Sequence, residues 1–313
     1  MDLRHLRTFV TVVDAGGIAK AAGRLHLTQP AASRQIMALE EDLGVALFDR
    51  IGRRVQLTPH GEELLQRSRR ILDEAESLAE RARVLKGGRD GTLRVGAPTQ
   101  TIEAVLAPFA ARFRQRYPGI EVHFREATAD RLRRHMDRGE VHIGVLPASP
   151  GPVEGPLLYP VHVTAVLALS HRLARRRVVE VTELSDEPML LLGHQFGLRS
   201  WFEAACEAAH LRPRVVAESA APHTLVALAR EGFGVAIVPS DMQPHHGDVR
   251  LLPVVHRGEP VGRWSGVGWN PRRALPAYAE RFATELAAAV KRSHPGRAIA
   301  RRSPPMPRPE HAR

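Results

Sequence analysis

Three polar side chains near the N-terminus have the types and the spacing suited to contacting DNA bases. In a helix, Ser33 would lie one turn after Gln29, with Arg34 beside it. Glutamine can form two hydrogen bonds with adenine, arginine can do the same with guanine, and serine can bond a base or a phosphate. The alternative for such residues in isolation is a solvated polar helix face.

The surrounding residues predict a helix that could hold these side chains in place. Thr28 is a suitable N-cap, and Pro30 is tolerated in the first turn because its missing N–H would be unpaired there. Apolar residues then recur at helical spacing until Gly44. An alanine-rich helix over residues 18–25 precedes a short break, which predicts a helix-turn-helix, the motif that inserts its second helix into the DNA major groove. Thr28 and the first-turn amides can hold a phosphate.

Two β-prone segments follow and predict a small hairpin, or wing. They cover residues 45–50 and 53–57, on either side of Ile51-Gly52. Three basic residues of this hairpin are candidates for contacts with the DNA backbone or the minor groove: Arg50, Arg53 and Arg54. We therefore assign residues 1–58 to a winged helix-turn-helix domain.

A long helix is predicted over residues 59–88, with Thr58 as its N-cap and Pro59 at its first position. Its large apolar residues recur every seven positions, which is typical of a helix that pairs with another helix. These residues are Leu64, Ile71, Leu78 and Leu85. We interpret them as a seam for self-association; the alternative is a helix packed on its own domain.

From residue 91 to 290 the pattern alternates between strands and helices, which predicts parallel sheets with crossover helices. Two such runs form two α/β lobes joined by crossing strands, as in periplasmic binding proteins. We place the first lobe at about 91–160 and 268–290 and the second at about 161–267. The fold class is therefore α/β overall, with an all-α winged helix-turn-helix and a linker helix before the two-lobed domain.

The composition of the chain indicates less about its function than the pattern of its residues does. The net charge of +11 over 313 residues suggests an anionic partner, but residues 291–313 hold seven basic residues against one acidic residue. This tail is rich in proline and arginine, and we predict it to be disordered. The single cysteine, Cys206, excludes an intramolecular disulfide and fits a reducing cytosol, where we interpret it as a core thiol.

The sequence gives no support for several other classes of protein. No apolar run is long enough for a transmembrane helix, and the N-terminus lacks the pattern of a signal peptide, so we expect a cytoplasmic protein without membrane contact. We find no nucleophile elbow, P-loop or paired-carboxylate motif, and His245-His246 has no further metal-ligand spacing beside it. We expect no catalytic residues, no bound metal and no cofactor.

Short runs along the chain form a specific combined pattern. They are LRTFV at 6–10, AAGRLHL at 21–27, TQPAASRQI at 28–36, LEEDLG at 39–44, LFDR at 47–50, LTPHG at 57–61, LRVG at 93–96, FRQRYP at 113–118 and GFGVAIVP at 232–239. This pattern resembles that of the LysR-type transcriptional regulators over about residues 1–290. One departure is Gly16-Gly17-Ile18-Ala19-Lys20, where the family usually has a serine followed by an aromatic residue and a threonine; glycine still serves as an N-cap.

The resemblance implies a transcription factor that binds double-stranded promoter DNA as a dimer or tetramer, in the nucleoid, and meets RNA polymerase there. It also implies a small-molecule effector between the lobes, at strand ends and helix starts, where α/β sheets bind ligands. Residues carried over from the family are Thr99, Gln100, Thr101, Thr128, Phe196 and Gly197. Helix-start amides and hydroxyls favour an anionic effector, although Thr99 and Thr128 are also explained as helix caps.

A different class of protein remains as the alternative. The two-lobed domain would also suit a cytosolic small-molecule-binding protein or an enzyme without DNA-dependent regulation. Binding of the purified protein to the DNA upstream of its own gene distinguishes the two.

Overall fold

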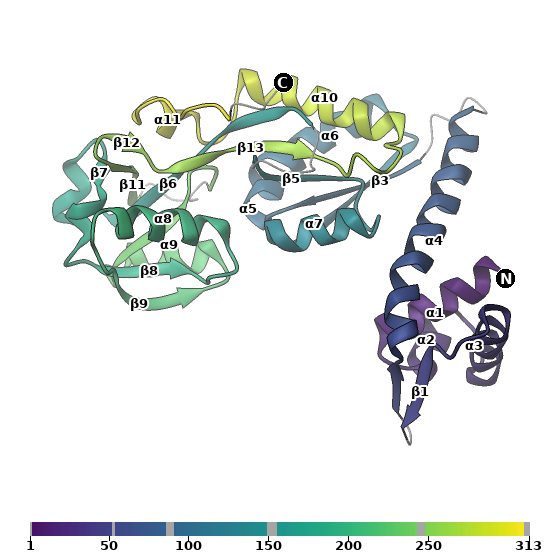
Figure 1. Ribbon diagram of the computed structural model, residues 1–313. Helices are drawn as coiled ribbons and strands as arrows, with labels where there is room; N and C mark the ends of the chain where they lie inside the picture. Colours follow the sequence, from purple (N-terminus) through teal and green to yellow (C-terminus); the bar gives the residue numbers. More distant parts are fainter. Residues whose placement is uncertain (1, 52–53, 86–90, 149–154, 243–247, 310–313) are drawn as a thin grey trace. The chain divides into compact units, whose positions relative to one another are not determined.

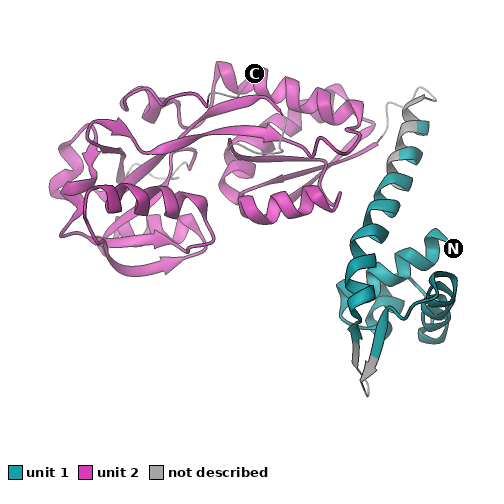
Figure 2. Cartoon of the chain, viewed as in Figure 1, with its two compact units in different colours: residues 1–87 teal, residues 88–313 magenta. Residues whose placement is uncertain are grey.

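The computed structural model describes residues 2–51, 54–85, 91–148, 155–242 and 248–309. The chain divides into two compact units, residues 1–87 and residues 88–313 (Figure 2). His245 and His246 lie outside the described residues. Among the described helices, none has the length and apolarity needed to cross a membrane.

The first unit begins with three helices and a hairpin, as predicted. They are α1 (Leu3–Ala15), α2 (Ile18–Arg24), α3 (Gln29–Leu43), β1 (Phe48–Ile51) and β2 (Arg54–Leu57). Gly17 is the N-cap of α2, without a side-chain hydrogen bond. Buried apolar side chains from all parts of the unit form one core, among them Leu6, Phe9, Ile36, Leu39 and Leu47.

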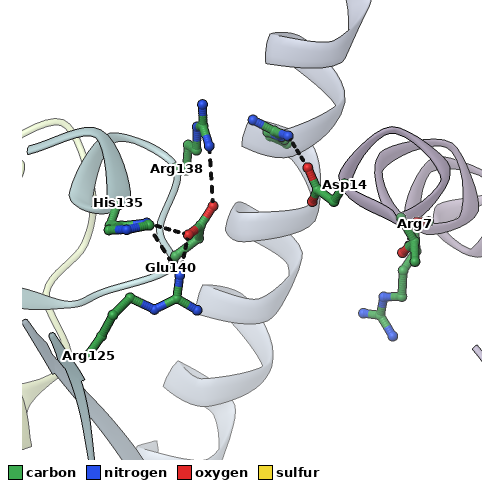
Figure 3. A network of polar contacts seen from close by, with 8 residues as sticks. Arg7, Asp14, Arg125, His135, Arg138 and Glu140 are labelled. Carbon is green, nitrogen blue, oxygen red and sulfur yellow. Dashed lines mark hydrogen bonds and ion pairs between the residues drawn. The ribbon is translucent and has the colours of Figure 1, made fainter. Parts of the chain in front are cut away.

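The long helix α4 (Pro59–Leu85) completes this unit. The Thr58 hydroxyl accepts a hydrogen bond from the Gly61 amide at 2.9 Å, so Thr58 caps the helix as predicted. Gly61 lies so close to the hairpin that a Cβ atom there would be 2.2 Å from the Leu47 carbonyl oxygen. Leu65 is buried in the core, and Arg69 forms an ion pair with Asp14 of α1 (Figure 3). The first half of α4 is therefore fixed to its own unit.

In the second unit the first lobe, which begins with β3, is a sheet covered by helices (Figure 1). Its elements are β3 (Gly91–Ala97), α5 (Thr99–Thr101), η1 (Ile102–Leu106), α6 (Ala107–Arg116), β4 (Ile120–Glu126), α7 (Ala129–Asp137), β5 (Ile143–Pro147) and α10 (Ala277–Arg292). The helical segment that runs from α5 through α6 contains a π-helical turn, η1. Pro108 follows this turn and lacks the N–H that would continue regular α-helical bonding.

Ion pairs hold one corner of this lobe. Glu140 accepts hydrogen bonds from Arg125 of β4 at 2.8 Å and shares a second contact with His135 of α7 (Figure 3). Arg138 at the end of α7 approaches the same carboxylate at 3.8 Å. These contacts join β4 to the end of α7.

The other lobe contains a second sheet. Its elements are β6 (Leu157–Ala168), η2 (Arg172–Arg175), β7 (Val179–Glu180), η3 (Val181–Leu184), β8 (Pro188–Leu192), α8 (Gly197–Ala208), β9 (Arg214–Ser219), α9 (Pro222–Arg230), β10 (Val235–Pro239), β11 (Val249–His256) and β12 (Glu259–Pro260). Cys206 is buried in its core, and burial raises the pKa of the thiol to about 12, as fits a core residue.

Two strands connect the lobes. The first part of β6 pairs with β13 (Gly262–Gly268), and the second part pairs with β10 and β11. The predicted boundary at 267/268 is wrong, because β13 pairs with β5 over Ser265–Gly268 and Val267 lies in the core of the first lobe. The lobe to which β13 belongs is set by long-range pairing, which a local sequence pattern does not show.

The predicted disorder of the tail is also wrong for residues 291–309. Helix α10 continues to Arg292, and a short helix, α11 (Arg297–Ala300), follows with Ile299 buried. The Trp264 indole N–H then donates to the Met306 carbonyl oxygen at 3.2 Å, and the Arg308 guanidinium lies 5.3 Å from the Trp264 ring centre. The proline and arginine content predicted disorder, but the burial of Ile299 and the contacts with Trp264 are enough to pack this segment on the domain.

Candidate functional site

The N-terminal end of α3 presents the predicted polar residues to solvent. Thr28 is the N-cap, and its hydroxyl accepts a hydrogen bond from the Ala31 amide at 3.3 Å. Gln29, Pro30 and Arg34 are exposed, and Ser33 is half-buried. The opposite face of the helix holds the buried residues Ala32, Ile36 and Leu39. The fold therefore fixes this face by packing and leaves its polar side chains free for contacts with DNA bases.

Met37 belongs to the same face and is absent from the polar pattern in the sequence. It lies one turn after Ser33 and Arg34, and its side chain is 45% exposed. An apolar side chain at this position is suited to contact with a thymine methyl group. Helical spacing from Ser33 would have identified it, but attention to polar chemistry alone does not.

The hairpin is attached directly to this helix. The Glu40 carboxylate accepts hydrogen bonds from the backbone amides of Leu47 and Phe48 at 2.8 and 3.2 Å. Arg50 and Arg54 lie on the paired strands β1 and β2, whereas Arg53 lies outside the described residues. The start of the hairpin is thus fixed to α3.

The predicted seam on α4 is divided between two environments. Leu64 is half-buried against the core of its own unit. Ile71 and Leu78 are exposed, by 41% and 72%. The side chain of Leu85, the last residue of α4, lies outside the described residues. The contacts with α1 and the core use Leu65, Arg69 and Leu72 instead, so the helix retains an exposed apolar stripe.

A second candidate site is a cavity of about 80 Å³ between the lobes. Five of the six predicted effector residues line it: Gln100, Thr101, Thr128, Phe196 and Gly197. Thr99 is not among the lining residues, because its hydroxyl donates to the Glu126 carboxylate at 2.8 Å on an exposed surface. Thr128 is the N-cap of α7 but makes no side-chain capping bond. Its hydroxyl is therefore better explained by the cavity than by capping.

A buried carboxyl group forms part of the cavity wall. Asp241, at the end of β10, accepts hydrogen bonds on Oδ2 from the hydroxyls of Thr101 and Tyr159, at 3.0 and 3.2 Å. Burial raises the pKa of Asp241 above its ordinary value of 3.8, although the two hydroxyls oppose that shift. The Thr101–Asp241 bond joins the first helix of one lobe to the turn that follows β10 in the other.

Other lining residues were not predicted from the sequence. They are mostly apolar or aromatic, with a few polar groups, and include Trp201, Asp241, Arg263, Trp264 and Ser265. Arg263 and Trp264 lie on the crossing strand β13, whose place beside the cavity depends on its pairing with β5 and β6. By contrast, Arg199 is buried and bonded to Glu203 and Glu218, at 2.7 and 3.0 Å. Arg199 therefore has a structural role.

Comparison with known proteins places both units in one family. Residues 3–62 match the bacterial regulatory helix-turn-helix proteins of the lysR family, and residues 86–291 match the LysR substrate binding domain. The regulator AlsR of Bacillus subtilis is 31% identical over 251 residues, covering 77% of this chain and 81% of AlsR. The regulator TfdS of Cupriavidus pinatubonensis is 32% identical, covering 77% and 83%.

Solved structures agree with this assignment. Full-length CbnR in complex with its target DNA has a TM-score of 0.63 and 26% identity, over 93% of this chain and all of CbnR. These relatives are transcriptional regulators rather than enzymes. The chain belongs to the LysR family and is a transcriptional regulator with a helix-turn-helix unit and a two-lobed effector-binding unit.

Proposed function

We propose that this regulator binds promoter DNA through the exposed face of α3, with Gln29, Ser33 and Arg34 as its base-contacting residues. The observation that carries the proposal is that these side chains face solvent while the opposite face of α3 is buried. Arg50, Arg53 and Arg54 of the hairpin contact the DNA backbone or minor groove. The relative CbnR, solved with its target DNA, supports this mode of binding.

Self-association through α4 brings two such units to one DNA site. Ile71 and Leu78 are large apolar side chains exposed on α4, and burying them against a second copy removes apolar surface from water. A dimer, or a pair of dimers, then binds two half-sites in the bacterial nucleoid. There it contacts RNA polymerase and changes transcription.

The effector in this proposal is a small molecule with an anionic group. Arg263, Gln100 and Thr128 offer a cation, an amide and a hydroxyl to the anion, and Phe196 and Trp264 surround its apolar part. Ligand pockets usually measure about 300–1,000 Å³, so a cavity of about 80 Å³ represents a closed arrangement of the lobes. A ligand that fits an open arrangement better would shift the lobes and thereby alter DNA binding.

An electrophoretic shift series tests the proposal. The probe is the DNA upstream of the regulator's own gene, titrated with the wild-type protein alone and with a panel of small carboxylates. We expect a specific shift that one or more carboxylates change. Absence of a specific shift would leave the protein as a small-molecule-binding protein of the same fold.

Two threonines provide a matched pair for the effector site. Thr128→Val removes a hydroxyl that lines the cavity, and Thr99→Val removes one that does not. We expect Thr128→Val to weaken the response to the active carboxylate while Thr99→Val retains it. Equal responses in both variants would contradict the assigned site.

A further inference from the structure

A large groove lies on the first lobe, between α6, α10 and the tail. Its volume is about 990 Å³, far more than the cavity between the lobes. Buried aromatic contacts hold its walls together, because Phe282 of α10 packs against Phe109 and Phe113 of α6, each with ring centres 4.9 Å apart. The groove is thus a fixed feature of the packed domain.

The rim of this groove is strongly cationic. Five arginines line it, and Glu285 is the one carboxylate among its described lining residues. The arginines are Arg112, Arg116, Arg292, Arg297 and Arg301. Glu285 already accepts the Tyr117 hydroxyl at 2.7 Å and pairs with Arg116 at 3.7 Å. Most of the positive charge on the rim is therefore not neutralised by the groove itself.

The arginines come from two sources. Arg112 and Arg116 lie one turn apart on α6, and Arg297 and Arg301 lie one turn apart in the tail. The match to the LysR substrate binding domain ends at residue 291, so three of the five arginines follow it. The groove is completed by a segment outside the shared domain.

Packing holds the tail arginines in place. Ile299 is buried between them, and Gly296 lies so close to Ser240 that a Cβ atom there would be 2.8 Å from the serine hydroxyl. The Arg297 guanidinium donates to the Arg292 carbonyl oxygen at 2.6 Å. A guanidinium held in this way loses less freedom when it binds an anion than a mobile one does.

We infer that this groove is a second ligand site, which takes a small organic molecule carrying several phosphate charges. Guanidinium groups match phosphate geometry through paired hydrogen bonds. The floor, which includes Val105, Pro108 and Ala289, offers apolar surface to the rest of the ligand. A concave site of this volume suits a small molecule better than the convex backbone of duplex DNA.

Occupancy of the groove has a physical route to the effector cavity. The His294 ring lines the groove and stacks on Tyr159, with ring centres 5.0 Å apart and planes at 12°. Tyr159 in turn donates to Asp241, which lines the cavity between the lobes. Tyr159 thus links His294, which lines the groove, to Asp241, which lines the effector cavity.

The test is calorimetric titration of the full-length protein with inorganic tripolyphosphate. Arg112→Glu combined with Arg301→Glu reverses two rim charges whose side chains are exposed and make no ion pair within the described part of the chain. We expect at least about tenfold weaker binding, because one lost hydrogen bond between charged groups has an effect of that size. The control is Arg175→Glu combined with Arg177→Glu, which changes the net charge equally on exposed residues outside the groove.

The control pair should retain wild-type affinity for tripolyphosphate. Equal weakening in both pairs would overturn the site, since it would show an effect of overall charge. Absence of saturable binding up to about 1 mM, a Kd worth only about 4 kcal/mol, would also overturn it. So would weaker binding to random-sequence duplex DNA with unchanged tripolyphosphate binding, which would make the groove a DNA surface.

Discussion

Helix α3 and the cavity between the lobes hold their polar side chains in opposite surroundings. In α3 these residues lie within seven consecutive positions and point to solvent, so a change there leaves the core intact. The cavity takes its lining from residues 98 to 265, and Thr101 and Asp241 are 4% and 2% exposed. Binding and stability are therefore separable in the first unit and coupled in the second.

The largest effect should come from α4, the helix that we propose pairs with a second copy of the chain. Ile71→Asp places a charge on the exposed apolar stripe of α4, so it should produce monomers. Affinity for DNA with paired half-sites should fall about a hundredfold or more, because linked binding is lost. Analytical ultracentrifugation measures the first effect and DNA titration the second.

Glu74→Ala, an exposed change on the same helix, is the control and should leave a dimer. A dimeric Ile71→Asp protein would mean that the seam does not join two copies. In that case the DNA-binding unit would have no partner on α4.

The next effect tests whether binding and stability are separable in α3. Arg34→Ala should weaken specific DNA binding by about 1–3 kcal/mol through loss of a base contact. Its melting temperature should match that of the wild type, because Arg34 is exposed. DNA titration and thermal melting are measured on the same preparation; unchanged affinity would remove Arg34 from the interface.

The features that the sequence could predict also differ between the first unit and the cavity of the second. The first unit is specified by local signals: Thr28 caps α3, Pro30 fits its first turn and Gly44 ends it in a left-handed conformation. Each signal acts within a few residues of its effect, so the helix and its functional face were predicted together. The seam on α4 was predicted because a seven-residue repeat is also a local pattern.

The cavity could be predicted only in part. Gln100 and Thr128 follow strands directly, and position at a strand end is visible in the sequence. Arg263 and Trp264 reach the cavity because β13 pairs with both β5 and β6, whose partner residues lie at least 100 positions earlier in the chain. No local sequence pattern encodes such a pairing. The packing of Met306 on Trp264 is likewise a long-range contact that composition misrepresented as disorder.

A smaller effect tests whether the tail belongs to the coupled region. Deletion of residues 303–313 removes the Met306 carbonyl and the Arg308 guanidinium from Trp264. One hydrogen bond and one exposed cation–π contact predict a loss of about 1–2 kcal/mol in the free energy of unfolding. Urea unfolding followed by tryptophan fluorescence measures it, and Trp264→Phe should reduce the loss, since phenylalanine has no N–H to donate. A deletion without effect would mean that the tail does not stabilise the domain.

The smallest effect is a dependence on pH at Asp241. Burial raises its pKa above 3.8, so the folded chain holds the proton at pH values where the unfolded chain has released it. The contribution of Asp241 to stability is therefore fully present below about pH 3.8 and is lost as the pH rises through the folded-state pKa. Asp241→Asn imitates the neutral acid, and its amide oxygen can still accept the hydroxyls of Thr101 and Tyr159.

We therefore expect Asp241→Asn to gain stability relative to the wild type as the pH rises from 4 toward neutrality. Urea unfolding of both proteins at several pH values measures this, and only the difference between them is interpreted. His162 and His294 lie nearby with lowered pKa values, caused first by burial, and their titration is common to both proteins. A difference independent of pH would show that Asp241 is ionised in the folded chain. The cavity would then present a negative charge next to Thr101, and an anionic effector would have to be held on the side of Arg263 and Thr128.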